Sequence, residues 1–147
     1  MLLMVQSIAQ NIALFCGALF AGGSVYTSPV EDPVNGAQGT ELAGVYLLTA
    51  HPRPVIFQAV FGVLAPIAGM LTRGTGGAIR WAVGGIILGA AALVQLFVAL
   101  PKMRRLGDAE FASNAERVSR LFDKLAKMHA AICLASLAAL FIFILHT

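Results

Sequence analysis

Four long apolar stretches constrain this 147-residue chain more than any other feature of its sequence. A helix needs about 20 apolar residues to cross the ~30 Å hydrocarbon core of a membrane. The stretches cover residues 2–26, 54–72, 81–100 and 125–145, and no charged residue precedes Glu31. Their apolar residues face all directions, which argues against amphipathic surface helices. We therefore expect an all-α protein, an integral membrane four-helix up-down bundle in which residues 1–147 form a single transmembrane domain.

The composition agrees with a membrane location. Hydrophobic residues make up 59% of the chain and charged residues 12%, about half the charged fraction of an ordinary soluble domain. This excludes an ordinary cytosolic enzyme, a disordered tail and a nucleic-acid-binding domain. The net charge of +3 suits the basic loops of a membrane protein better than a nucleic-acid-binding surface. We expect membrane lipid, and no nucleic acid, as a partner.

Lysine and arginine are unevenly distributed over the predicted loops. One side of the membrane would hold only Arg73 and Arg80. The first and third loops, on the other side, hold Arg53, Lys102, Arg104, Arg105, Arg117, Arg120, Lys124 and Lys127. Since cytoplasmic loops carry the excess of basic residues, we expect these two loops in the cytoplasm and both termini outside it, in a bacterial inner membrane.

Local signals add detail to the loops and helix faces. Ser113 and Glu116 have the spacing of a capping box, which predicts that the fourth helix begins near Asn114. A short interfacial helix is predicted over residues 40–50, with Leu42, Val45, Tyr46 and Leu48 toward the membrane. Small residues recur at four-residue intervals, as at Gly85 and Gly89, and permit close helix packing. That packing is either within one bundle or between copies, and we expect a homo-oligomer or a larger membrane complex.

Each predicted helix brings one polar side chain to a similar depth near the cytoplasmic side. These residues are Tyr26, Gln58, Gln95 and His129, with Glu31 a few residues beyond the first helix. Polar groups that converge at one level of a bundle can form a ligand site. The alternative is structural: the two glutamines bond to each other or to the backbone, His129 is an interfacial residue, and Glu31 pairs with an arginine of the third loop.

The sequence gives little support for a metal or a cofactor, and we expect none. Cys16 and Cys133 lie in different stretches without a neighbouring cysteine, so no zinc or disulfide spacing is present. A haem held by two histidines would need His51 and His129 at similar depth, but His51 lies in a loop between prolines.

Three segments resemble the anthrone oxygenase-like family of small four-span membrane proteins. Residues 21–33, with the sequence AGGSVYTSPVEDP, resemble the family's small-residue helix end followed by a tyrosine and a valine-glutamate-x-proline. Residues 101–106 resemble its proline-x-asparagine-x-x-leucine, with Met103 in place of asparagine. Residues 120–130 resemble its entry to the fourth helix, with Leu125 for tryptophan and Met128 for leucine. The order and spacing agree over most of the chain.

The resemblance implies a function that some members have in aromatic polyketide pathways. They oxidise an anthrone to an anthraquinone with molecular oxygen and no cofactor. Such a reaction needs a base near neutrality, donors for the phenolate oxygen and a flat apolar slot. Imidazole titrates in that range, so we expect His129 as the base, oriented by Glu31. Tyr26, Gln58 and Gln95 would bind the ligand and donate to its oxygen.

A second hypothesis is a non-catalytic accessory or structural subunit of a larger membrane complex. A catalytic protein should have a closed cavity that holds Gln58, Gln95 and His129. An accessory subunit should instead satisfy these groups among themselves or with a partner chain.

Overall fold

The computed structural model describes residues 2–28, 45–48, 51–72 and 77–145, and every element within these ranges is helical. Its helices include α1 (Leu2–Tyr26), α4 (Pro52–Met70), α5 (Ala78–Val94), the π-helix η2 (Gln95–Ala99), α6 (Leu100–Arg104), the 3₁₀ helix η3 (Arg105–Gly107), α7 (Ala109–Ala112) and α8 (Ala115–Ile144).

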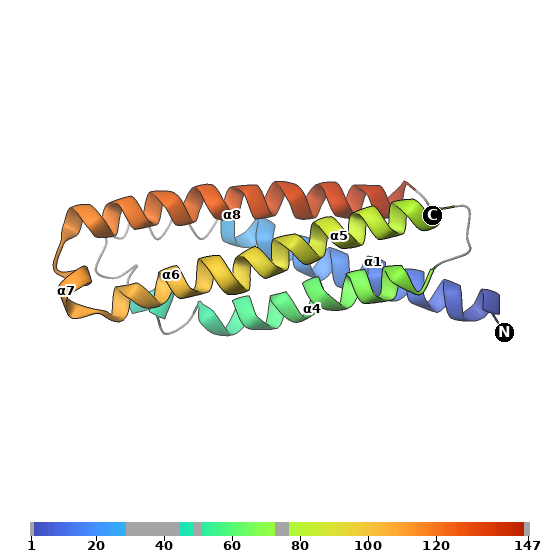
Figure 1. Cartoon of the computed structure of the whole chain (residues 1–147), viewed down its shortest axis with the longest axis horizontal. Coiled ribbons are helices and arrows are strands. Elements are labelled where there is room, and N and C mark those ends of the chain that lie inside the picture. Colours follow the sequence, from blue (N-terminus) through green and yellow to red (C-terminus); the bar gives the residue numbers. More distant parts are fainter. Residues whose placement is uncertain (1, 29–44, 49–50, 73–76, 146–147) are drawn as a thin grey trace.

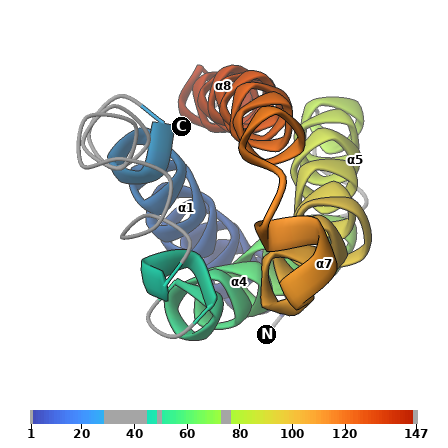
Figure 2. The ribbon, with the colours of Figure 1, turned by 90° about the vertical axis from the view of Figure 1, so that its left-hand side faces the viewer.

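Four segments are long and apolar enough to cross a membrane. They are Leu3–Tyr26, Pro52–Met70, Ala78–Gly107 and Ala115–Ile144. In the bundle, α1 packs against α4 and α8, and α5 packs against the same two helices (Figures 1 and 2). The start of α1 and the end of α8 lie at one end of the bundle, and α7 lies at the other (Figure 1). The chain is therefore a small membrane protein with the predicted all-α four-helix architecture.

Glycines allow the helices to approach closely in the bundle core. A Cβ atom on Gly85 would lie 2.9 Å from the Cα atom of Pro66 on α4, and one on Gly89 would lie 3.4 Å from the Cγ atom of the same proline. The face formed by Gly85 and Gly89 thus packs inside the chain against Pro66. Of the two uses predicted for this face, the structure has the packing within one bundle.

The third long helix extends past the predicted end of its apolar stretch. The apolar stretch ends at Leu100, before Pro101, and the helix continues beyond it through α6 and η3 to Gly107. A π-helical turn precedes the proline, and in it the N–H of Leu100 donates to the carbonyl of Gln95, five residues back. Pro101 then stands in the first turn of α6, where a missing N–H is tolerated.

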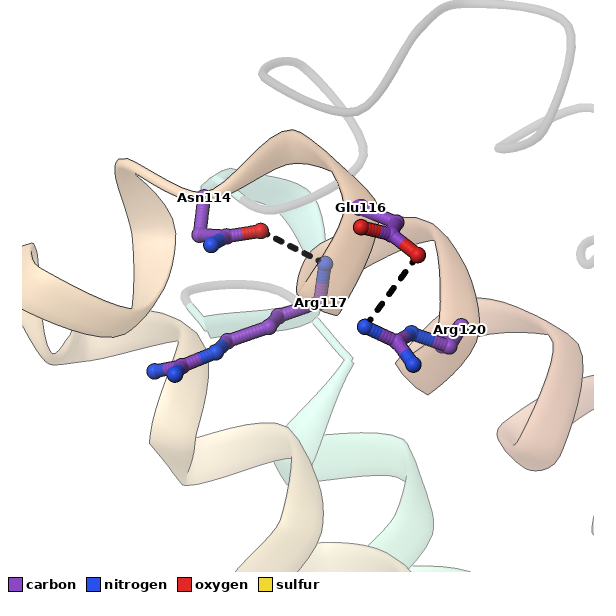
Figure 3. Close-up of polar contacts among 4 residues, drawn as sticks. All are labelled: Asn114, Glu116, Arg117 and Arg120. Carbon is purple, nitrogen blue, oxygen red and sulfur yellow. Dashed lines mark hydrogen bonds and ion pairs between the residues drawn. The ribbon is translucent and has the colours of Figure 1, made fainter.

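The start of α8 is close to the prediction, but a different residue caps it. The capping box at Ser113 is wrong, because the Ser113 hydroxyl donates to the carbonyl of Glu110 at 2.8 Å. Asn114 is the N-cap, and its Oδ1 atom accepts a hydrogen bond from the N–H of Arg117 at 3.0 Å (Figure 3). Asparagine satisfies a helix N-terminus as well as serine does, so the helix starts one residue later.

A second apolar cluster closes the end of the bundle near α7. Residues 45–48 form a helical turn, and the side chain of Leu47 is buried in this cluster with Met103, Val118 and Leu121. Tyr46 and Leu48 pack against the same cluster, so the expectation that they face the membrane is wrong. Of the predicted membrane-facing side, Val45 is exposed and Leu42 lies outside the described residues.

Candidate functional site

A polar network connects α1, α4 and η2 inside the bundle. The Nε2 atom of Gln58 donates to the carbonyl of Phe20 at 2.7 Å and to the hydroxyl of Ser24 at 2.8 Å. The Nε2 atom of Gln95 donates to Oε1 of Gln58 at 3.1 Å. Ser24 also donates to the carbonyl of Phe20 at 3.0 Å. Because amides in hydrocarbon need partners, this network holds three helical segments in register.

The network uses both N–H groups of Gln58 and leaves part of Gln95 unused. Gln58 has no further N–H for a ligand oxygen while these two bonds persist. The Oε1 atom of Gln95 is buried and has no hydrogen-bond partner among the described residues. Gly23 makes room for the network, since a Cβ atom there would lie 2.8 Å from Cδ of Gln58.

Two histidines come together beside this network. His51 is the N-cap residue of α4, and Pro52 stands in the first turn of that helix, where its fixed φ suits a helix start. The ring centroids of His51 and His129 are 5.8 Å apart, and that of Tyr46 is 6.1 Å from that of His51. Both imidazoles are buried, so the fold places an imidazole pair at the N-terminal end of α4.

A pocket of about 240 Å³ lies between α1 and α4, beside His51. Its polar side chains are Tyr26, Thr27, Tyr46, His51 and Gln58, and its other lining residues are Leu19, Gly23, Pro54, Val55, Phe57 and Phe61. Leu19 and Phe57 are also exposed on the outside of the bundle. The pocket is therefore mainly apolar and opens toward the surface that would face lipid.

The remaining predicted residues line a much smaller cavity. Gln95 and His129 border a space of about 10 Å³ with Ser24, Thr27 and Ile132. That volume is near the minimum of ~10–15 Å³ needed for one water, so an aromatic ligand does not fit there. Thr27 borders both cavities.

The two pockets separate Gln58 from Gln95 and His129, so neither is the closed cavity holding all three residues that a catalytic protein should have. The predicted site residues fall into three groups. Tyr26, which is 58% exposed, and Gln58 line the larger pocket. Gln95 lies behind Gln58, to which it is hydrogen-bonded, and His129 lies behind His51 in the histidine pair. Glu31 lies outside the described residues.

The sequence pattern assigns no role to Ser24, and it suggests His51 only as a haem ligand. Ser24 was detectable as a hydroxyl close to Tyr26 in the first apolar stretch. The position of His51 depends on how residues 45–48 fold back on the bundle, and no local pattern reports that. Within the described part of the chain, no group of three or more histidine, cysteine, aspartate or glutamate residues is placed to hold a metal ion.

Comparisons with known proteins return no match. Neither a protein-family model, nor a curated protein sequence, nor a solved structure is significantly similar to this chain.

The Gln58–Gln95 hydrogen bond should be measurable as a coupling energy. In a double-mutant cycle with Gln58→Leu and Gln95→Leu, we expect a coupling of about 0.6 kcal/mol, and up to about 1.7 kcal/mol, the range found for side-chain bonds in membrane bundles. Unfolding in mixed micelles, followed by circular dichroism, measures it. Gln10→Leu on α1, outside this network, is the matched control and should show no coupling with Gln95→Leu. Zero coupling in the test cycle would contradict the bond.

Proposed function

We propose that the protein binds a flat, apolar aromatic compound in the pocket between α1 and α4, and oxygenates an anthrone or quinol-like aromatic there without a cofactor. The observation that carries the proposal is the composition of that pocket: an apolar wall with two tyrosines and an imidazole. Ligand pockets combine these features. Its ~240 Å³ is below the ~300 Å³ typical of drug-sized sites, which favours a compact ring system.

The route of the ligand also supports a lipophilic compound. Leu19 and Phe57 form part of the pocket wall and are exposed on the outer face of the bundle. A compound dissolved in the bilayer can reach the pocket between these two side chains without passing through water. In the proposed orientation, the pocket opens into the cytoplasmic leaflet of the inner membrane, with both termini on the opposite side.

The proposed chemistry needs only a base, a donor and oxygen. Removal of a proton from the central CH₂ of an anthrone gives an aromatic phenolate, which transfers an electron to O₂. Recombination gives a hydroperoxide, and loss of water gives the anthraquinone. One anthrone and one O₂ thus yield one anthraquinone and one water, and no external reductant is consumed.

The proposal gives each residue of the site a separate role. The His51–His129 pair takes the proton, with His51 on the ligand side and His129 as the second imidazole. The Tyr26 hydroxyl lines the pocket and donates to the phenolate oxygen. Gln58 and Gln95 hold the wall of the pocket through their mutual bond. Glu31 retains its predicted role of orienting His129.

Turnover of an anthrone by the reconstituted chain tests the proposal. We expect protein in phosphatidylcholine nanodiscs to consume O₂ and to form anthraquinone absorbance from 1,8-dihydroxyanthrone faster than empty nanodiscs do. His51→Ala and His129→Ala should each lower this rate, by about 10²-fold or more if the pair supplies the base. Undiminished turnover in His129→Ala would remove that residue from the mechanism.

Binding can be tested apart from turnover. Leu19→Trp narrows the pocket entrance and should weaken binding of the anthraquinone product. Leu64→Trp makes the same change at a similarly exposed position on α4 that does not line the pocket, and should leave binding unchanged. Equal binding by both variants would place the compound elsewhere.

The accessory-subunit function remains the second candidate because of one observation. Gln58 and Gln95 satisfy part of their hydrogen bonding through each other, as that hypothesis expected. The two candidates give opposite results in the binding experiment, since an accessory subunit purified alone should bind no aromatic compound that Leu19→Trp displaces.

A further inference from the structure

A second pocket, of about 270 Å³, lies at the end of the bundle near α7. Its lining contains five basic residues, Lys102, Arg105, Arg117, Arg120 and Lys124, together with Phe111 and Leu121. The basic residues come from two sides: α6 and η3 supply the first two, and the first turns of α8 supply the others.

Helix geometry explains how the two sides face each other. Arg117, Leu121 and Lys124 stand at i, i+4 and i+7 and so share one face of α8. Leu121 is buried in the apolar cluster that also contains Met103 and Leu106, which docks this face of α8 against α6 and η3. The chain thereby holds both sets of basic residues around one space.

Among the residues that the structure describes, little negative charge offsets the positive charge of this pocket. Arg120 forms an ion pair with Glu116 at 3.3 Å, on an exposed part of α8. In Figure 3 the side chain of Arg117 extends away from that pair. Within the described residues, no acidic side chain lines the pocket, and its other four basic side chains form no ion pair. Like charges held together repel, so an anion is the occupant that stabilises this arrangement.

The depth of the pocket identifies the kind of anion. Phe97 is 72% exposed and belongs to the apolar surface that faces lipid. Lys102 follows five residues later, about 7.5 Å farther along the helix at 1.5 Å per residue. The headgroup layer is roughly 5–7.5 Å thick on each side of the hydrocarbon core. With Phe97 placed at the edge of that core, Lys102 comes to headgroup level, where basic pockets between membrane helices bind phospholipid headgroups.

We propose that this pocket binds the phosphate-bearing headgroup of an anionic phospholipid. The phosphate lies between the basic residues of α6–η3 and those of α8, and Phe111 and Leu121 contact the less polar part of the headgroup. The proposal is independent of the pocket between α1 and α4.

Titration of the full chain with phosphatidylglycerol in a neutral detergent, followed by native mass spectrometry, measures the binding. The test variant is Arg105→Gln with Lys124→Gln. The matched control is Arg104→Gln with Lys127→Gln, which removes the same charge from the same two helical regions outside the pocket. We expect about fivefold weaker binding for each pocket residue removed, and little change in the control.

Further measurements distinguish lipid binding from a loss of folding and from binding of free phosphate. Arg105→Lys with Lys124→Arg keeps the charge and should keep most of the binding, which a loss of folding would not. Phosphatidylcholine should bind much more weakly than phosphatidylglycerol, and inorganic phosphate alone should bind more weakly than the lipid. Equal losses in the pocket and control variants, equal binding of the two lipids, or tighter binding of inorganic phosphate would each overturn the proposal.

Discussion

Gly62→Leu is expected to abolish assembly of the native bundle. Gly62 lies in α4 at the point where α1 and α5 approach it. A Cβ atom on this residue would lie 2.6 Å from the Cβ atom of Ala92 and 2.7 Å from Cδ2 of Phe20, and both neighbours are fully buried. Ordinary overpacking costs about 1–3 kcal/mol, and a leucine adds three more carbons beyond this clash. In size-exclusion chromatography the variant should lose the elution peak of the folded protein. It should also lose its resistance to unfolding in mixed micelles.

The same substitution at Gly22 is a matched control. Gly22 lies in α1, and a Cβ atom there would have nothing within 4 Å. Gly22→Leu should therefore assemble normally, since it only adds apolar surface to an exposed position. Gly62→Ala gives a graded test and should destabilise the bundle although alanine is the better helix former. Native stability of Gly62→Leu would show that α4 does not pack at this distance.

Phe143→Ala is expected to cause the largest loss from removing a side chain, about 3–5 kcal/mol of unfolding free energy. Phe143 is fully buried and stacks on Trp81, with ring centroids 4.9 Å apart and an interplanar angle of 20°. Its ring also fills the space above Gly84 and Gly17, where added Cβ atoms would lie 2.5 Å and 3.3 Å away. Its removal leaves a void that these glycines cannot close.

Unfolding of Phe143→Ala in mixed micelles, with the near-ultraviolet signal of Trp81 as a second probe, checks this expectation. Phe141→Ala is the control, because Phe141 lies two residues earlier on α8 and is 62% exposed. It should cost much less than Phe143→Ala. Similar losses for the two variants would mean that α8 is rotated relative to the described packing.

The sequence predicts the number of helices well but not which side of each faces the core. The four spans follow from apolar length alone. Apolar residues on all sides of a membrane helix carry no amphipathic signal. The sequence therefore does not decide whether the side chain of Gln58 faces a ligand or Gln95. Their hydrogen bond is the structural alternative stated from the sequence.

The wrong predictions concern features that no local sequence pattern reports. Ser113 and Asn114 are both good helix caps, and only the backbone geometry shows that Asn114 is the one used. The helix continues through Pro101 because a π turn precedes the proline, and that turn has no sequence signature. The sequence pattern places His51 in a loop, but residues 45–48 pack onto the bundle and His51 lies beside His129. These features depend on tertiary contacts.

The π turn at Gln95–Ala99 also decouples the two halves of its helix. Such a turn contains one residue more than an α-helical turn, and each residue of an α-helix accounts for about 100° of rotation. The turn therefore acts as a one-residue insertion that sets the azimuth of Lys102 and Arg105 independently of the bundle interior before it. A single deletion here would turn the cationic end of the helix about the axis while leaving the hydrophobic half in place, so the length of this segment, rather than its composition, aims those charges.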